Sequence, residues 1–131
     1  MQVYRPDARE RGIVAYDEPL EDSFRGLVVL KGNPRQSGRE DFASPDGALS
    51  AGVWECTMGS FRITYPMDEI ATLLKGKLVI TDDRGRKTTL EAGDSFFVAK
   101  GETLTWDIIE PVRKSYFLYM RPTKAAKAAA E

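Results

Sequence analysis

The side chains of this 131-residue chain that could carry chemistry are one glutamate, one lysine and several aromatic residues in its second half. Glu69 offers a carboxylate that can accept a hydrogen bond or act as a general base. Lys114 offers an ammonium group that can pair with a carboxylate or act as an acid. Tyr65 and Tyr116 lie close to these two residues in the sequence and add hydroxyl groups. The residue types therefore indicate recognition of a small polar molecule, or proton transfer to it.

The chain contains no histidine. Histidine is the commonest protein ligand of transition metals and the usual proton shuttle near neutral pH, so Ser–His and Cys–His catalysis are excluded. Tyr65 and Glu69 could hold a hard cation such as Mg²⁺, but one carboxylate is too few ligands for tight binding. No glycine spacing matches a phosphate-binding loop. We expect neither a metal nor a cofactor.

Charge and hydropathy exclude other partners. Nineteen basic and twenty acidic residues are interleaved, giving a net charge of −1 that does not favour nucleic acid. We find no apolar run long enough to span a membrane and no signal peptide, so we expect a cytoplasmic protein. Cys56 is the single cysteine, which agrees with a reducing compartment. It has no neighbouring histidine base, and we interpret it as buried and inert.

The elements that must position these residues are short strands. Aromatic and β-branched runs bounded by turn residues predict antiparallel strands, which favour an all-β sandwich or barrel. These runs cover residues 53–57, 61–65, 73–81, 87–90, 95–98, 103–109 and 114–120. Residues 27–30 predict a short buried strand, and the proline- and glycine-containing stretch 31–50 predicts a long loop. We divide the chain into an N-terminal arm, strand and loop (1–43), a barrel (44–120) and a tail (121–131).

Glycine spacing in the first half of this barrel matches a known motif. Gly59, Tyr65, Met67, Glu69 and Gly76 follow the spacing of the first cupin motif. Tyr65 and Met67 stand where that motif carries its two histidines, and Glu69 comes earlier than the usual glutamate.

The second cupin motif is matched by Gly93, Ala99, Gly101, Leu104 and Ile108. Leu104 stands at its histidine and Ile108 at its asparagine. The segments GVWEC, YPMDE and EPVRKSY also resemble the cupin subfamily named for the (S)-ureidoglycine aminohydrolase cupin domain. This resemblance implies a single-domain cupin, which is a double-stranded antiparallel β-barrel. The histidines that hold a metal in those aminohydrolases have no counterpart here, and those enzymes are two-cupin chains.

Strand alternation places the side chains within the barrel. If Tyr65 points inward, then Phe61 and Ile63 share its face, because alternate residues of a strand face the same side. The same reasoning turns Leu104, Trp106, Ile108 and Leu118 inward and Arg113 outward. We expect Asp68 to be solvated, because charged side chains are mostly exposed. The predicted ligand-binding residues are Trp54, Cys56, Tyr65, Glu69, Trp106, Lys114 and Tyr116.

Three functions remain open at this point. The first is metal-free binding of a small polar metabolite, with Glu69 accepting from an amine or ureido group and Lys114 pairing with a carboxylate. The second is a small enzyme resembling the aminohydrolase, with Glu69 as general base and Tyr65 or Lys114 as acid. The third is a structural dimer module whose barrel is filled, in which Glu69 is a rim carboxylate or an ion-pair partner of Lys114. We also expect a homodimer formed through parts of residues 1–50, with the strand at 27–30 as the shared element.

Overall fold

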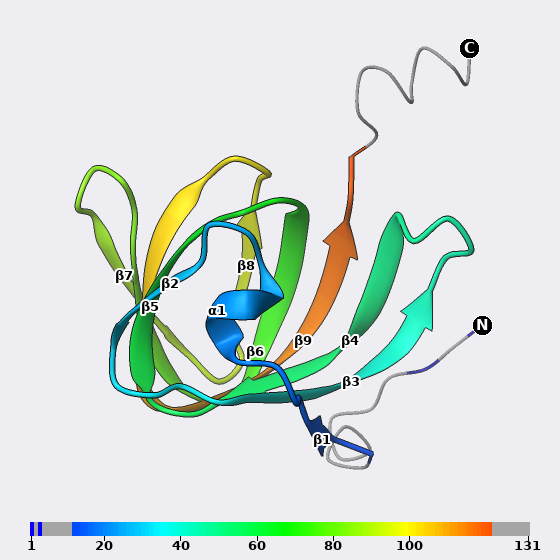
Figure 1. Ribbon diagram of the computed structural model, residues 1–131, viewed down its shortest axis with the longest axis horizontal. Helices are drawn as coiled ribbons and strands as arrows, with labels where there is room; N and C mark the ends of the chain where they lie inside the picture. The colour runs from blue at the N-terminus through cyan, green and yellow to red at the C-terminus, as the bar shows by residue number, and fades with distance from the viewer. Residues whose placement is uncertain (2, 4–11, 122–131) are drawn as a thin grey trace.

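The computed structural model describes residues 1, 3 and 12–121, and nearly all regular structure in this part of the chain is antiparallel β-sheet. The strands are β1 (Val14–Ala15), β2 (Val28–Lys31), β3 (Gln36–Ala43), β4 (Leu49–Cys56), β5 (Gly59–Thr64), β6 (Asp68–Thr81), β7 (Lys87–Glu91), β8 (Ser95–Val98) and β9 (Thr103–Tyr119). A short helix, α1 (Leu20–Ser23), precedes β2. Figure 1 shows the strands curving around an interior, with α1 in front of its opening. The predicted all-β barrel is confirmed.

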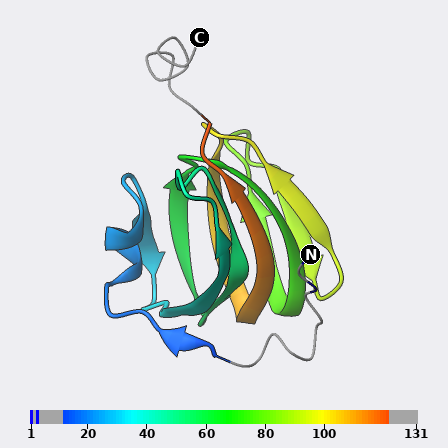
Figure 2. The same ribbon diagram turned by 90° about the vertical axis from the view of Figure 1, so that its right-hand side faces the viewer.

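Strand β9 is the centre of the topology. Its C-terminal half pairs with β4 on one side and β6 on the other, and its N-terminal half pairs with β5 and again with β6. Figure 2 shows β9, in orange, between β4 and β6. The runs predicted at 103–109 and 114–120 are therefore one continuous strand, in which Pro111 lies between the two halves. One bent strand thus contributes side chains to the barrel interior along most of its length.

The bend of β6 against β9 depends on Gly76. Three register shifts between Leu73 and Leu78 show that β6 is irregular there. Gly76 has a φ of +91°, which side chains of L-residues rarely allow, and an added Cβ would clash with the Pro111 carbonyl oxygen. This glycine of the first cupin motif is therefore required where the two long strands cross closely.

Two expectations for the N-terminal half are wrong. The stretch 31–50 is not a long loop, because β3 occupies its middle and pairs with β4 from Gln36↔Cys56 to Ala43↔Ser50. The proline residues of this stretch lie outside β3. The polar residues within β3 gave no strand pattern in the sequence, but they are compatible with a strand whose backbone pairs with β4. The strand at 27–30 forms as β2 (Val28–Lys31), but Val28 and Leu30 are exposed. The C-terminal tail from residue 122, like residues 2 and 4–11 of the arm, lies outside the described residues.

The barrel interior is packed with apolar side chains from alternate strand positions, as predicted. Phe61, Ile63 and Tyr65 are buried on one run, and Leu104, Trp106 and Ile108 on another. Trp106 is 1% exposed and stacks on Phe61 at 5.5 Å between ring centroids. It also meets Trp54 and Phe96 edge to face, each at 5.9 Å. Such aromatic pairs contribute about 0.5–1.5 kcal/mol each beyond their burial, so this cluster makes a rigid floor for the interior.

Candidate functional site

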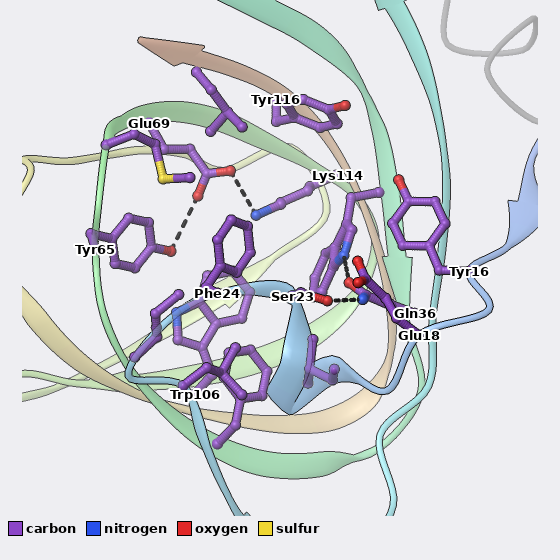
Figure 3. Close-up of a pocket in the computed structure, with 17 residues that line it drawn as sticks. Tyr16, Glu18, Ser23, Phe24, Gln36, Tyr65, Glu69, Trp106, Lys114 and Tyr116 are labelled. Atoms are coloured by element: carbon purple, nitrogen blue, oxygen red, sulfur yellow. Dashed lines mark hydrogen bonds and ion pairs between the residues drawn. The ribbon is translucent and has the colours of Figure 1, made fainter. Parts of the chain in front are cut away.

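The barrel contains a cavity of about 190 Å³ that the aromatic side chains leave unfilled (Figure 3). A water molecule takes about 30 Å³ of liquid volume, so the space corresponds to roughly six waters. Strands β4, β5, β6 and β9 form its walls, and the N-terminal segment with α1 covers it. Its lining residues are Tyr16, Glu18, Leu20, Ser23, Phe24, Leu27, Gln36, Trp54, Phe61, Ile63, Tyr65, Met67, Glu69, Trp106, Lys114, Tyr116 and Leu118.

A buried ion pair lies on the wall of this cavity. Lys114 Nζ donates to Glu69 Oε2 at 2.7 Å, and the Tyr65 hydroxyl donates to Glu69 Oε1 at 3.1 Å. Glu69 is 3% exposed and Lys114 is 7% exposed. Glu69 is on β6 and Lys114 on β9, and the register of these strands sets Glu69 opposite Leu118 and Lys114 opposite Leu73. Both side chains face inward because they occupy interior positions of neighbouring strands.

Two tryptophans stabilise the charge of Lys114. Its Nζ lies 4.6 Å from the centroid of the Trp54 ring and 4.9 Å from that of Trp106. Aromatic faces attract cations through their quadrupole, and the attraction is stronger where water is excluded. The ammonium group therefore has one carboxylate and two ring faces as partners, which explains how a lysine can be buried in an otherwise apolar barrel.

Burial keeps the tyrosines of the cavity protonated. Burial, followed by the negative charge of Glu69, raises the pKa of Tyr65 well above its usual value of 10.0. Burial also raises the pKa of Tyr116, with a further contribution from Tyr16. The pKa of Tyr16 is itself raised, first by burial and then by Glu40. These hydroxyl groups therefore act as neutral hydrogen-bonding groups, and Tyr65 serves as a donor.

One buried donor of the cavity has no partner among the described residues. Trp106 Nε1 makes no hydrogen bond of acceptable geometry. It points toward the Tyr65 hydroxyl closely enough to lower the pKa of that phenol, an effect smaller than that of burial. An unpaired buried donor is costly, so a ligand or water oxygen beside Trp106 would be bound favourably.

The N-terminal segment supplies lining residues that the sequence analysis did not predict. Leu20 and Phe24 come from α1 and its C-terminal end, and Gln36 connects this cover to the wall. Gln36 Nε2 donates to Ser23 Oγ, and Gln36 Oε1 accepts from Trp54 Nε1 at 3.0 Å. The apolar spacing of Leu20 and Phe24, four residues apart, is the local signal that could have indicated this helical turn with one buried face.

Of the seven predicted ligand-binding residues, six line the cavity and Cys56 does not. Cys56 is 2% exposed and packs in the core, where burial raises the pKa of its thiol to about 12. Asp68 is partly exposed outside the cavity, and Arg121 donates to both of its oxygens at 2.6 and 2.8 Å. Arg113 is absent from the cavity and pairs with Glu55 at 2.6 Å.

The donor set does not fit a metal ion. The positions of the cupin-motif histidines hold Tyr65, Met67 and Leu104, of which the last two offer no ligand for a hard cation. Both oxygens of Glu69 already bind Tyr65 and Lys114. Across residues 12–121, no three residues of the types His, Cys, Asp and Glu come together as a metal-binding group. Lys114 instead supplies the positive charge within the barrel.

Comparison with known proteins identifies the class of this fold. The chain matches the model of the EutQ-like cupin domain family over residues 43–116, and it belongs to this family and thus to the cupin superfamily. A search of the curated proteins finds no match. The part of the chain that the structure describes has no helix with the length and apolar character needed to cross a membrane.

Solved structures agree with this assignment. The EutQ protein of Clostridium difficile is 26% identical, with 66% of this chain and 69% of that chain covered and a TM-score of 0.58. A structure from Salmonella typhimurium whose name refers to ethanolamine utilization protein Q is 25% identical, with 67% and 72% covered and a TM-score of 0.58. A DUF861 family protein from Pseudomonas syringae has a TM-score of 0.73 at 23% identity, covering 84% of this chain and 45% of that chain, which is a likeness of fold alone.

Proposed function

We propose that this protein binds a small polar metabolite in the barrel without a metal. The observation that carries the proposal is the Glu69–Lys114 ion pair on the wall of an unfilled cavity. A buried ion pair seldom stabilises a fold more than apolar residues of the same volume would. Its presence beside open space therefore favours a role in recognition over one in core packing.

The polar groups suggest how a ligand would be oriented. A carboxylate or carbonyl oxygen of the ligand would accept hydrogen bonds from Lys114 and from the unpartnered Trp106 Nε1. An amine or ureido N–H would donate to Glu69. The rings of Trp54, Tyr65, Trp106 and Tyr116 would pack against the carbon atoms of the ligand. Cys56 lies outside this arrangement.

The volume of the cavity and the name of one relative narrow the range of candidate ligands. A cavity of about 190 Å³ suits a molecule smaller than the drug-sized ligands that occupy about 300–1,000 Å³. The Salmonella typhimurium relative is named for ethanolamine utilization, and ethanolamine is a small amine. This supports including ethanolamine, with amino acids, ureides and small carboxylates, among the first compounds to test.

A ligand screen by thermal shift, followed by isothermal titration calorimetry, tests the proposal. We expect at least one compound to bind in the presence of EDTA, and Glu69→Gln and Lys114→Met to weaken binding at least tenfold. Glu55→Gln is the matched control, because it alters a comparable ion pair outside the cavity and should leave binding unchanged. If no compound binds, or if binding survives both cavity substitutions, the proposal is wrong.

A second candidate is an enzyme resembling (S)-ureidoglycine aminohydrolase. The observation that favours it is the contact of the Glu69 carboxylate with two proton donors, Tyr65 and Lys114, inside one cavity. Glu69 would take a proton from the attacking water, and Tyr65 or Lys114 would protonate the departing amine. Release of ammonia from a ureide, abolished by Glu69→Gln, would support this activity. The third possibility, a filled structural barrel, is disfavoured by the volume of the cavity.

A further inference from the structure

Apolar side chains form a continuous row across five neighbouring strands. Phe42 of β3 is in register with Ala51 of β4, and Ala51 is in register with Phe117 of β9. Phe117 is in register with Ile70 of β6, which is in register with Phe97 of β8. We call these five residues the outer row. Residues in register across strands share one face of the sheet, so the outer row is a single surface feature.

The outer row faces away from the cavity. The chain neighbours of its members on β6 and β9, Glu69 and Tyr116, line the cavity, and successive side chains of a strand point to opposite faces. The four large members are exposed: Phe97 by 62%, Ile70 by 53%, Phe117 by 43% and Phe42 by 40%. These are large apolar side chains in water, and none of them is needed to complete the barrel interior.

The exposed area is what one half of a dimer interface requires. Tyr119 lies two residues after Phe117 on the same face, and it is also exposed, by 37%. At about 200 Å² for a large side chain, these residues expose roughly 500 Å² of apolar surface, comparable to the apolar patches that mark interaction sites. A standard interface buries about 800 Å² on each partner, of which about 65% is apolar in homodimers. The outer row together with Tyr119 supplies this apolar share.

Three ion pairs lie beside the outer row. Arg39 binds Asp41 at 2.6 Å, and Arg121 binds Asp68 at 2.6 Å. Arg113 binds Glu55 farther along the same face. In a two-fold interface each surface meets its own copy, so a patch with net charge would repel itself. Ion pairs of zero net charge keep this repulsion low, and they offer little to a strongly charged partner.

We propose that a second copy of this chain packs its outer row against this one about a two-fold axis, forming a face-to-face contact of two sheets. The interface then lies on β4, β6, β8 and β9 together with Phe42, and not on the strand at 27–30. That strand, as β2, is at the end of the sheet order, and a contact through its edge is the outcome that the test must distinguish from the outer row.

Sedimentation velocity of the full chain between about 1 and 100 µM tests the proposal. We expect a dimer, and we expect Phe117→Ser and Ile70→Thr each to raise its dissociation constant at least tenfold. Ile109→Ser is the matched control, because Ile109 is also on β9 and is 50% exposed but lies outside the row. Leu30→Ser, at 49% exposure on β2, tests the edge-strand alternative. Both of these variants should leave the dissociation constant within twofold.

A cross-linking experiment covers the case in which a row variant fails to fold. Cys56 is buried and is the only native cysteine, so an Ile70→Cys chain carries one accessible thiol. A short bismaleimide should link Ile70→Cys chains into dimers and leave Ile109→Cys chains unlinked. A wild-type monomer at 100 µM would overturn the proposal and leave the row to another partner. A dimer lost only in Leu30→Ser would overturn it in favour of β2.

Discussion

Replacing Lys114 with Met tests whether the cavity ion pair is as strongly coupled as its geometry implies. Methionine keeps the long apolar stem but removes the ammonium group that contacts Glu69 at 2.7 Å and two tryptophan rings at 4.6 and 4.9 Å. Glu69 is then a carboxylate at 3% exposure with Tyr65 as its remaining hydrogen-bond donor. Removing one partner of a buried pair costs about 3–5 kcal/mol, and the adjoining cavity admits water, so we expect a loss of about 3 kcal/mol.

The complementary variants complete a double-mutant cycle. Glu69→Gln keeps an acceptor oxygen for Tyr65 and leaves Lys114 with its two aromatic contacts, so we expect a loss of about 1–3 kcal/mol. The double variant contains neither buried charge and should lie within about 1 kcal/mol of the wild type, because neutral replacements of a buried pair are often tolerated. The expected coupling energy is therefore on the order of 3 kcal/mol.

Urea denaturation at pH 7, monitored by tryptophan fluorescence and circular dichroism, measures the free energy of unfolding of the wild type, the two single variants and the double variant. The control cycle uses Lys77 and Glu91, an ion pair at 3.6 Å whose side chains are 41% and 64% exposed. Its coupling should stay below about 1 kcal/mol. Additive losses for Glu69 and Lys114 would refute the reasoning. Strong coupling combined with no ligand response would leave only a structural module.

Two further predictions concern stability. The folded chain holds the Cys56 proton until a pKa of about 12, whereas the unfolded chain releases it near 9.0. The free energy of unfolding should therefore fall by about 1.4 kcal/mol for each pH unit from pH 9 toward pH 12. Chemical denaturation at several pH values should show a smaller dependence on pH for Cys56→Ala than for the wild type. An equal dependence would exclude this thiol as the cause. Gly76→Ala combines an unfavourable φ of +91° with a clash against Pro111, so thermal denaturation should show a loss above about 3 kcal/mol or no folded protein. Gly85→Ala, with a φ of +79° and no atom within 4 Å of the added Cβ, should lose only about 1 kcal/mol; equal losses at the two glycines would contradict the role given to the strand crossing.

The arm and β3 show where sequence reasoning was insufficient. Residues 36–43 have the polar, glycine-containing composition of a loop, yet they form a strand because their backbone pairs with β4 from Gln36 to Ala43. Leu20 and Phe24 cover a cavity whose walls come from residues far along the chain. Neither feature depends on local propensity. Both arise where a distant segment happens to present a free edge or an open interior.

The sequence by itself determined the architecture and the direction of the interior side chains. Strand alternation is a local property, so Phe61, Ile63 and Tyr65 could be turned inward from their spacing alone, as could Leu104, Trp106 and Ile108. Tertiary structure decided that Glu69 and Lys114 bind each other, that Asp68 binds Arg121 and that Cys56 packs in the core outside the cavity. These outcomes depend on which strands become neighbours and in which register. Hydrogen-bond and ion-pair distances of about 3 Å are reached only after the barrel closes.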